Sequence, residues 1–254
     1  MSYEDISLEI DGGIARLTFR RPDKLNALRE QTGDEMQAAF DEMEQNPDVR
    51  VVLLTGEGRA FGAGYDLTRV KPGEIPDMAK ILEDNYNPLT RKMRASRLPI
   101  VSVVNGPCAG ASVGIALSAD IVIAARSAYF YEPFVGLALI PDAGNTLFLP
   151  RIVGRIRAAG AMLLAEKISA EEALSWGMVW RVYEDAELMG EAEKIVQKLA
   201  GYSPTSVSLI KKLISEASDH GMSHQLDMER DAQGEACGSE EMQAAIASFF
   251  KGKP

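Results

Sequence analysis

Short apolar runs that alternate with segments of helical spacing constrain the fold of this chain more than any other feature. Each apolar run follows a segment whose apolar residues recur at three- and four-residue intervals. The expected helices cover residues 28–45, 77–96 and 111–118, and the strands that follow them lie at 49–56, 99–106 and 120–125. Because strands joined through helices pair in parallel, the pattern predicts an α/β fold with a largely parallel sheet.

The two ends of the chain depart from this alternation. ISLEI and IARLTF flank Asp11-Gly12-Gly13, which predicts a hairpin because glycine accepts a positive φ. Beyond a capping box at Ser169–Glu172 and the strand-like MVWRVY, the spacing is helical at 187–200, 205–217 and 240–250. We therefore expect a core of residues 1–195 and a C-terminal helical region, 196–254, that packs on a neighbouring subunit or across the core.

Composition excludes several classes of protein. A net charge of −10 and a pI near 4.9 disfavour nucleic-acid and anionic-lipid partners, which attract basic proteins. The apolar runs are too short to cross a bilayer, and MSYEDISLEI lacks the basic start of an export signal. Cys108 and Cys237 form no disulfide framework. We expect a cytoplasmic protein with free thiols and no membrane partner, metal or redox cofactor.

Two loops with glycines follow two of the predicted strands. They are FGAGYDL at Phe61–Leu67 and NGPCAGAS at Asn105–Ser112. Gly62 and Gly64 let the backbone turn sharply or approach a ligand, whereas Gly110 precedes a helix whose first N–H groups lack partners. Either loop alone could be a simple turn. Together they predict a site for a negatively charged oxygen.

These loops, the strand around Asp120 and the block Phe134–Arg151 resemble the crotonase, or enoyl-CoA hydratase/isomerase, family. RPDKLNAL resembles the CoA-binding loop of that family, and SAEEALSWGMV resembles its downstream helix. The resemblance covers nearly the whole chain. It implies a spiral of repeated β-β-α units around a pocket for an acyl-CoA thioester. It also implies a homotrimer, or a hexamer of two trimers, with the C-terminal helices in the contacts.

The resemblance assigns an oxyanion hole to two backbone groups. They are the N–H groups of Tyr65 and Ala111, which follow Gly64 and Gly110. Two such donors stabilise the negative charge that grows on a thioester oxygen as an enolate forms. We expect Asp66 to brace its own loop by hydrogen bonds to backbone N–H groups.

The resemblance also implies a grip on CoA, which is part of the substrate and not a separate cofactor. Lys24 and the backbone of Leu25 and Ala27 correspond to the groups that hold the CoA phosphates and adenine. Phe250 and Lys251 are expected to cover the adenine site of a neighbouring subunit. The alternatives are a solvated basic turn for Lys24 and ordinary packing for the aromatic side chain.

Two positions depart from the pattern of the hydratases in this family. The hydratases carry two catalytic glutamates, and the corresponding positions here are Gly114 and Phe134. Without that pair no evident group activates a water molecule while another donates a proton. Simple hydration of an enoyl-CoA is therefore not expected from the sequence.

Asp142 instead matches the acid of the branch that isomerises a ring epoxide of phenylacetyl-CoA and shifts enoyl-CoA double bonds. One carboxylate can take a proton from one carbon and return it to another. Its apolar neighbours, Leu137–Ile140 and Leu147, are expected to raise its pKa. Alternatively, Asp142 caps a helix that begins near Gly144. Glu132 is a second nearby acid, and the sequence leaves open whether it faces the site.

The sequence thus predicts an acyl-CoA isomerase of the enoyl-CoA hydratase/isomerase family, with Asp142 as proton shuttle. An enoyl-CoA hydratase is the first alternative. A hydrolase resembling the aryl-CoA dehalogenases is the next, since those enzymes also carry an acid at this position, but they have a Trp where Phe134 stands. A non-catalytic CoA-thioester or RNA-binding member of the family is the last, and the acidic balance disfavours RNA.

Overall fold

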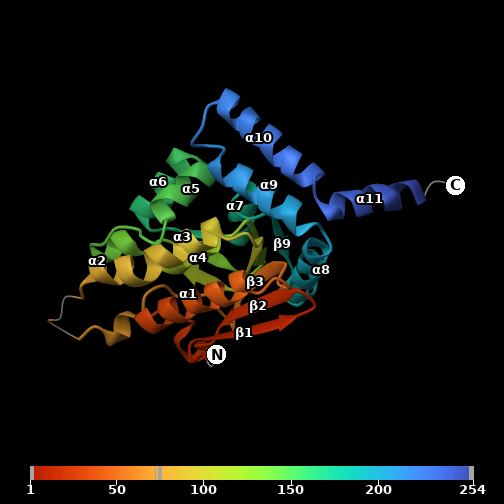
Figure 1. The fold of residues 1–254 in the computed structure, drawn as a ribbon. Helices are drawn as coiled ribbons and strands as arrows, with labels where there is room; N and C mark the ends of the chain where they lie inside the picture. The colour runs from red at the N-terminus through yellow and green to blue at the C-terminus, as the bar shows by residue number, and fades with distance from the viewer. Residues whose placement is uncertain (1–2, 72, 74–75, 252–254) are drawn as a thin grey trace.

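A six-stranded sheet runs through the centre of the computed structural model, which describes residues 3–71, 73 and 76–251 (Figure 1). Its order is β1 (Ile6–Asp11), β2 (Ile14–Phe19), β3 (Val51–Gly56), β4 (Ile100–Val104), β6 (Ile121–Ala125) and β9 (Arg181–Tyr183). The pair β1–β2 is antiparallel, and the other pairs are parallel. Gly12 and Gly13 form the hairpin turn at φ values of +57° and +80°. The predicted α/β fold, parallel sheet and hairpin are confirmed.

A second, three-stranded sheet carries the elements next to the candidate site. It consists of β5 (Pro107–Ala109), β7 (Tyr129–Tyr131) and β8 (Lys167–Ser169). Strands β5 and β7 are parallel, with Ala109 opposite Tyr131, and β7 and β8 are antiparallel. Strands β5 and β8 were not expected from the sequence, because three residues are too few to show an alternation of apolar and polar side chains.

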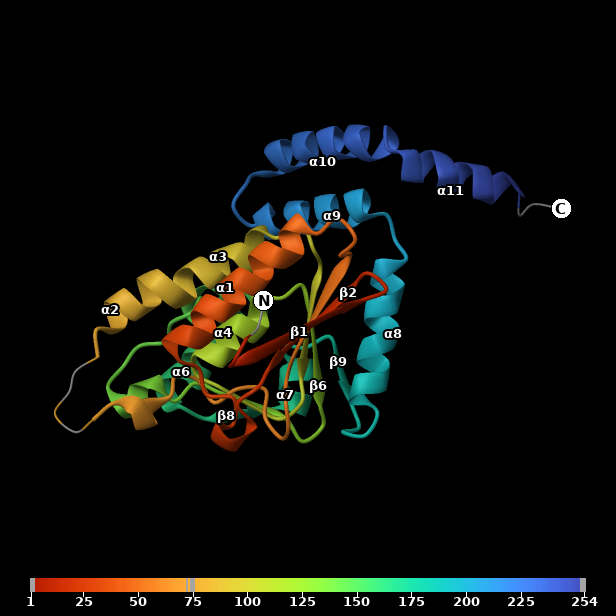
Figure 2. The same ribbon diagram turned by 60° about the horizontal axis from the view of Figure 1, so that its bottom comes forward.

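Helices cover both faces of the main sheet (Figure 2). On one side lie α1 (Glu30–Gln45), α2 (Met78–Ile81), α3 (Asn87–Ala95) and α4 (Ala111–Leu117). On the other side α8 (Leu188–Ala200) contacts β2, β3, β4, β6 and β9. The single helix expected over residues 77–96 consists of α2, a π-helix at Leu82–Tyr86 and α3. Such π-turns often mark functional sites.

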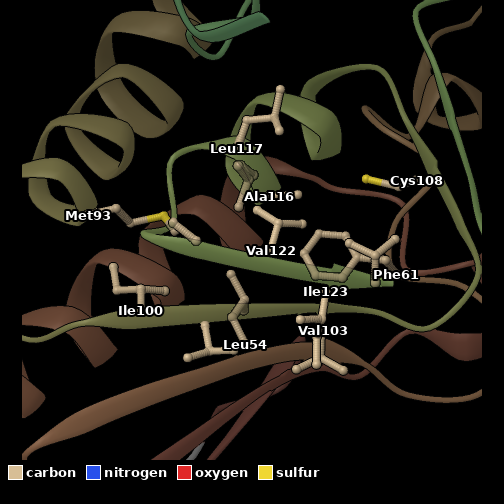
Figure 3. Close-up of a cluster of buried hydrophobic side chains, with 14 of the residues drawn as sticks. Leu54, Phe61, Met93, Ile100, Val103, Cys108, Ala116, Leu117, Val122 and Ile123 are labelled. Atoms are coloured by element: carbon tan, nitrogen blue, oxygen red, sulfur yellow. The ribbon is translucent and has the colours of Figure 1, made fainter. Parts of the chain in front are cut away.

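The hydrophobic core lies between the main sheet and these helices (Figure 3). Leu54, Val103 and Ile123 come from three neighbouring strands and meet Phe61 of the first glycine loop. The side chain of Leu117 on α4 is also buried there. The loops at the ends of β3 and β4 therefore start from a close-packed base, which fixes their backbones.

The remaining helices follow the second sheet along the chain. They are α5 (Asn145–Val153), α6 (Arg155–Leu164), α7 (Ala170–Ser175), α9 (Pro204–Glu216), α10 (Met222–Cys237) and α11 (Glu240–Lys251). The capping box that starts α7 is confirmed, since Ser169 and Glu172 exchange hydrogen bonds of 3.2 and 2.9 Å. The sequence analysis does not predict α6 and α10.

The last two helices project from the body of the protein (Figures 1 and 2). Helix α9 is tied to the core, because the ammonium of Lys211 donates to the carbonyls of Met93 and Leu98 and pairs with Asp120 at 2.9 Å. In contrast, no side chain of α10 is buried. The expected boundary near residue 195 falls inside α8, and the division into 1–195 and 196–254 stays a prediction.

Cys108 is buried and Cys237 is exposed, and both are free thiols, as predicted. Within the described ranges, none of the helices combines the length and the apolar character that a membrane crossing needs. The same residues contain no cluster of three or more His, Cys, Asp or Glu side chains that could hold a metal ion.

Candidate active site

The two glycine loops leave the same edge of the main sheet and meet. They follow β3 and β4, which are adjacent and parallel, so their carboxyl ends lie side by side. Gly64 and Gly110 have φ values of +81° and +56°. A Cβ atom added to Gly110 would lie 3.5 Å from the Cα atom of Gly64, so the two backbones are in van der Waals contact. The predicted convergence of the loops is confirmed.

Two backbone donors remain unpaired where the loops meet. Among the described residues, the N–H groups of Tyr65 and Ala111 donate no hydrogen bond. Ala111 is the first residue of α4, so its N–H has no acceptor within the helix. Several donors beside them are paired: the N–H of Gly64 donates to the hydroxyl of Ser112 at 3.2 Å, that of Asp66 to the carbonyl of Leu28 at 2.8 Å, and that of Gly110 to the carbonyl of Tyr131 at 2.9 Å. Two free amides on adjoining loops are the groups that an oxyanion hole requires.

Asn145 holds the second of these loops in place. Its side chain is fully buried, and its Nδ2 atom donates to the carbonyl of Gly110 at 3.1 Å. The structure shows that it connects the start of α5 to the residue that precedes Ala111.

The Tyr65 side chain is anchored away from its backbone N–H group. Its hydroxyl donates to Glu30 at 2.8 Å, and Glu30 pairs with Arg69 at 2.8 Å. Burial and the bond to Glu30 raise the pKa of Tyr65 to about 12. The phenol therefore stays protonated at neutral pH, with its hydroxyl directed to Glu30.

Asp142 lies in the loop before α5 and points one carboxyl oxygen into the interior. Its Oδ1 atom is inaccessible to solvent, and no described group lies within hydrogen-bond distance of it. Burial raises the pKa of Asp142 to about 6. The capping alternative is wrong, because the cap residue of α5 is Gly144 and no side chain caps the helix. Asp142 is therefore a half-buried acid with one carboxyl oxygen that no described side chain pairs with.

The cause of this burial differs from the expected one. Leu137, Leu139, Ile140 and Leu147 are exposed, Ile140 by 80%, so they do not form an apolar enclosure in this chain. The loop is instead enclosed by α4. A Cβ atom added to Gly114 would lie 2.4 Å from the carbonyl oxygen of Ala143.

The same contact explains a departure from the hydratase pattern. Gly114 stands where the hydratases carry a glutamate, and the loop of Asp142 occupies the space such a side chain would need. The second such position, Phe134, holds a buried ring, and a Cβ atom added to Gly110 would lie 3.8 Å from its Cζ atom. Neither position can supply the missing acid.

Glu132 supplies a second carboxyl group that the sequence left open. It follows β7, is 1% exposed, and neither carboxyl oxygen has a hydrogen-bond partner among the described residues. Burial and then the charge of Asp142 raise the pKa of Glu132 to about 9. Phe130, Glu132 and Phe134 are all buried, which settles the face of the strand toward which this residue points.

Tyr86 is a further residue near the site that sequence reasoning missed. It ends the π-helix, is 2% exposed, and its hydroxyl has no partner among the described residues. Burial, followed by the charges of Glu30, Tyr65 and Asp142, raises its pKa. In the sequence it is one more aromatic residue on a helix, and nothing in its spacing separates it from core packing.

The predicted CoA loop is clamped to the first glycine loop. Arg21 donates to the carbonyl of Ala27 and pairs with Asp66 at 2.9 Å. Asp66 also accepts from the N–H and hydroxyl of Thr68 at 3.2 and 2.6 Å, so its predicted bracing role is confirmed. Leu25 has a φ of +52°, which turns the chain sharply at this point.

The structure brings only part of the predicted CoA grip together. Lys24 is exposed beside the loop, whereas the N–H groups of Leu25 and Ala27 bond within it, each at 3.0 Å. Phe250 is 66% exposed on α11, which contacts α10 and projects away from this loop (Figure 1). The side chain of Lys251 lies outside the described residues. Phe250 and Lys251 could thus serve only another subunit, and these assignments stay predictions.

Comparisons with known proteins agree with this geometry. The Enoyl-CoA hydratase/isomerase family model matches residues 9–254. The chain is 40% identical to 1,2-epoxyphenylacetyl-CoA isomerase of Escherichia coli (strain K12), over 97% of this chain and 95% of that protein. It is 36% identical to a probable enoyl-CoA hydratase of Rhodobacter capsulatus, over 100% of this chain and 98% of the other. A crystal structure of an enoyl-CoA hydratase subunit from Geobacillus kaustophilus superimposes with a TM-score of 0.92 at 30% identity, covering 99% and 97% of the two chains.

The buried state of Glu132 predicts a specific pH dependence of stability. Its pKa rises from 4.5 to about 9 on folding, so the folded state binds the proton more tightly than the unfolded state. The stabilisation is complete below the lower value and is lost as the pH rises through the higher one. Glu132→Gln removes this loss. The Tm advantage of the variant over the natural protein should therefore widen steadily from about pH 5 to about pH 9.

Calorimetric or fluorescence melts at several pH values measure this difference. Glu193→Gln serves as a matched control, because Glu193 pairs with Arg16 at 2.7 Å and has a lowered pKa. Its Tm difference should not grow over the same range. A constant Tm difference for Glu132→Gln would show that Glu132 is ionised in the folded protein.

Proposed function

Because the chain belongs to the enoyl-CoA hydratase/isomerase family, we propose that it is an acyl-CoA isomerase that stabilises a thioester enolate and moves a proton with Asp142. One observation carries the proposal. The half-buried Asp142 has an inaccessible carboxyl oxygen that forms no hydrogen bond with the described residues, it lies in a loop that packs on α4, and α4 begins with a free amide. The substrate is an acyl-CoA in which either a double bond shifts or a ring epoxide rearranges.

The two free amides account for the electrostatic part of the reaction. The N–H groups of Tyr65 and Ala111 donate hydrogen bonds to the thioester oxygen and stabilise the negative charge that develops when a neighbouring carbon loses its proton. Gly64 and Gly110 let the two donors approach each other, and Asn145 fixes the second loop. Fixed donors need no reorganisation during the reaction, which is why each donor lowers the activation free energy substantially.

Asp142 accounts for the proton transfer. A pKa of about 6 leaves it ionised at neutral pH, yet basic enough to remove a proton acidified by the oxyanion hole. The protonated carboxyl group then returns the proton to another carbon of the same conjugated system. An isomerisation of this kind needs one carboxylate and no bound metal ion.

The relatives support an isomerase more than a hydratase. The most similar curated relative given above is named as an isomerase, although others are named as hydratases. Gly114 and Phe134 occupy the hydratase glutamate positions, and neither residue has a side chain that can transfer a proton. Two other functions fit the site less well than an isomerase does. Neither a dehalogenase-like hydrolase nor a purely binding protein accounts as well for the free amides and Asp142 together.

We also propose how the chain binds CoA and assembles. Lys24 is exposed beside the first glycine loop and would hold the nucleotide together with the backbone of Leu25 and Ala27. The C-terminal helices would form a homotrimer or hexamer, since α10 and α11 expose Met222, Leu226, Ile246 and Phe250. Apolar side chains exposed in this number mark interaction surfaces. The cytoplasm remains the proposed compartment.

Asp142→Asn tests the proton shuttle. The amide keeps the size of the side chain and cannot act as a base, so conversion of a 3-enoyl-CoA into the conjugated 2-enoyl-CoA should slow by about 10²- to 10⁴-fold. The appearance of conjugated thioester absorbance measures the rate. Asp48→Asn, at an exposed position in the loop between α1 and β3, is the control. Full activity of Asp142→Asn would rule out the proposed function.

Ala111→Pro tests the oxyanion hole. Ala111 is the first residue of α4, where proline fits the helix and removes only the N–H donor. We expect kcat for the same isomerisation to fall by about 10²- to 10³-fold, with little change in Tm. An unchanged kcat would mean that this amide does not hold the thioester oxygen.

Sedimentation equilibrium tests the assembly. The natural protein should sediment as three or six chains, and Phe250→Asp should shift it toward single chains, because a charge would then enter an apolar contact. Gln243→Asp places the same charge on another exposed position of α11 and should leave the mass unchanged. A natural protein that sediments as a single chain at micromolar concentration would contradict the proposal.

A further inference from the structure

Glu132 is a buried acid that no structural interaction explains. Its carboxyl group forms no ion pair or hydrogen bond with the described residues, although burying such a group without a partner costs several kcal/mol. The buried acids elsewhere in the chain differ. Asp5 accepts from Arg29 at 2.7 and 2.6 Å, and Asp66 accepts from Arg21 at 2.9 Å. A fold that needed Glu132 only for packing would be more stable with glutamine there.

The position of Glu132 links the two halves of the candidate site. Parallel pairing places Ala109 opposite Tyr131, so the next residues along the two strands, Gly110 and Glu132, are also neighbours. The bond from the N–H of Gly110 to the carbonyl of Tyr131 fixes this register at 2.9 Å. Glu132 is thus held beside the loop that carries the free amide of Ala111.

Two titratable groups face this carboxyl group. One is Asp142, whose negative charge acts on Glu132, and the other is the thiol of Cys108, which is fully buried on β5. The pKa of Cys108 is raised by burial and then by the charge of Glu132, so the thiol stays neutral. Of these two groups, Asp142 is therefore the charged one that acts on Glu132.

We propose that Glu132 is a second catalytic carboxyl group of this site, a neutral acid that donates its proton to the acyl chain while Asp142 acts as the base. The inference rests on the proposed role of Asp142 as the base. It goes beyond a single shuttle, because the proton that is removed and the proton that is delivered then belong to different groups.

The step balances without another reactant. Asp142 takes a proton from one carbon of the acyl chain, and the electron pair of that C–H bond becomes the enolate held by the two amides. The O–H bond of Glu132 breaks as its proton forms a C–H bond at the conjugated carbon, and the double bond shifts. Asp142 is then protonated and Glu132 ionised, and transfer of the proton from Asp142 to Glu132 restores both groups.

The different protonation states of the two acids at neutral pH suit these roles. At neutral pH Asp142, with a pKa of about 6, is ionised, and Glu132, with a pKa of about 9, is protonated. Two titratable groups whose surroundings separate their pKa values in this way typically divide into base and acid. Above about pH 9 the acid is lost, which predicts an alkaline limit to activity.

Glu132→Gln separates the catalytic role from a structural one. Isomerisation of a 3-enoyl-CoA should show an alkaline fall in kcat near pH 9 in the natural protein. In the variant this fall should disappear, and kcat at neutral pH should drop by about 10²-fold, because glutamine cannot donate the proton. Glu132→Asp keeps an acid in place and should regain part of the rate together with an alkaline limit.

A single turnover in D2O provides an independent measurement. The natural protein should deliver a solvent-derived deuteron from Glu132 to the product, whereas in Glu132→Gln the proton returned by Asp142 should remain largely that of the substrate. Ser102→Ala is the matched control. Ser102 is also buried without a partner, but it lies within β4, and its replacement should change neither kcat nor the pH profile.

The outcomes distinguish this inference from the proposed function. If Glu132→Gln keeps the kcat, the alkaline limit and the isotope content of the natural protein while Asp142→Asn is inactive, Glu132 is not an acid of the reaction and the single shuttle stands. If Asp142→Asn is also fully active, both proposals fail.

Discussion

The contact between the backbones of Gly64 and Gly110 is the constraint on which the site depends. Both residues have positive φ values, and a side chain on Gly64 would meet the carbonyl of Ala109 at 3.0 Å. The contact exists because the loops leave adjacent parallel strands at the same edge. It aligns two amides that have no other acceptor among the described residues, and every proposed chemical step uses the charge they stabilise.

A buried network of charges holds the first of these loops against the rest of the fold. Asp5, Arg21, Arg29 and Asp66 connect the start of β1, the predicted CoA loop, α1 and the loop of Tyr65. Asp5 and Asp66 are 1% and 4% exposed, and each accepts more than one hydrogen bond. Buried charges with this degree of pairing specify geometry more than they add stability. The same buried network thus holds both the predicted CoA-binding loop and the loop of Tyr65 in place.

Local patterns predicted the sheet and the two glycine loops, because each depends on residues close in sequence. Burial of particular acids could not be predicted in the same way. Glu132 lies at the end of β7, which pairs with β5, and Tyr86 is buried at the end of a π-helix between α2 and α3, so both depend on features that no local pattern shows. The cause of the burial of Asp142 was predicted wrongly. Its apolar sequence neighbours are exposed, and the contact that encloses its loop depends on Gly114, about 30 residues earlier in the sequence. Helix α10 was missed because few of its residues are apolar.

The absence of the hydratase glutamates has a physical reason that bears on how such sites diversify. Gly114 lets the loop of Asp142 approach α4, so one change removes an acid and makes room for another. Phe134 fills the second position with a ring, and Glu132, two residues earlier on the same buried face, carries a carboxyl group instead. Glu132 is buried and Asp142 half-buried, so burial raises both pKa values, while the charge of Asp142 raises that of Glu132 further. Two neighbouring acids with little contact to water cannot both ionise at low cost, and this electrostatic conflict is the physical basis of the different roles we propose for them.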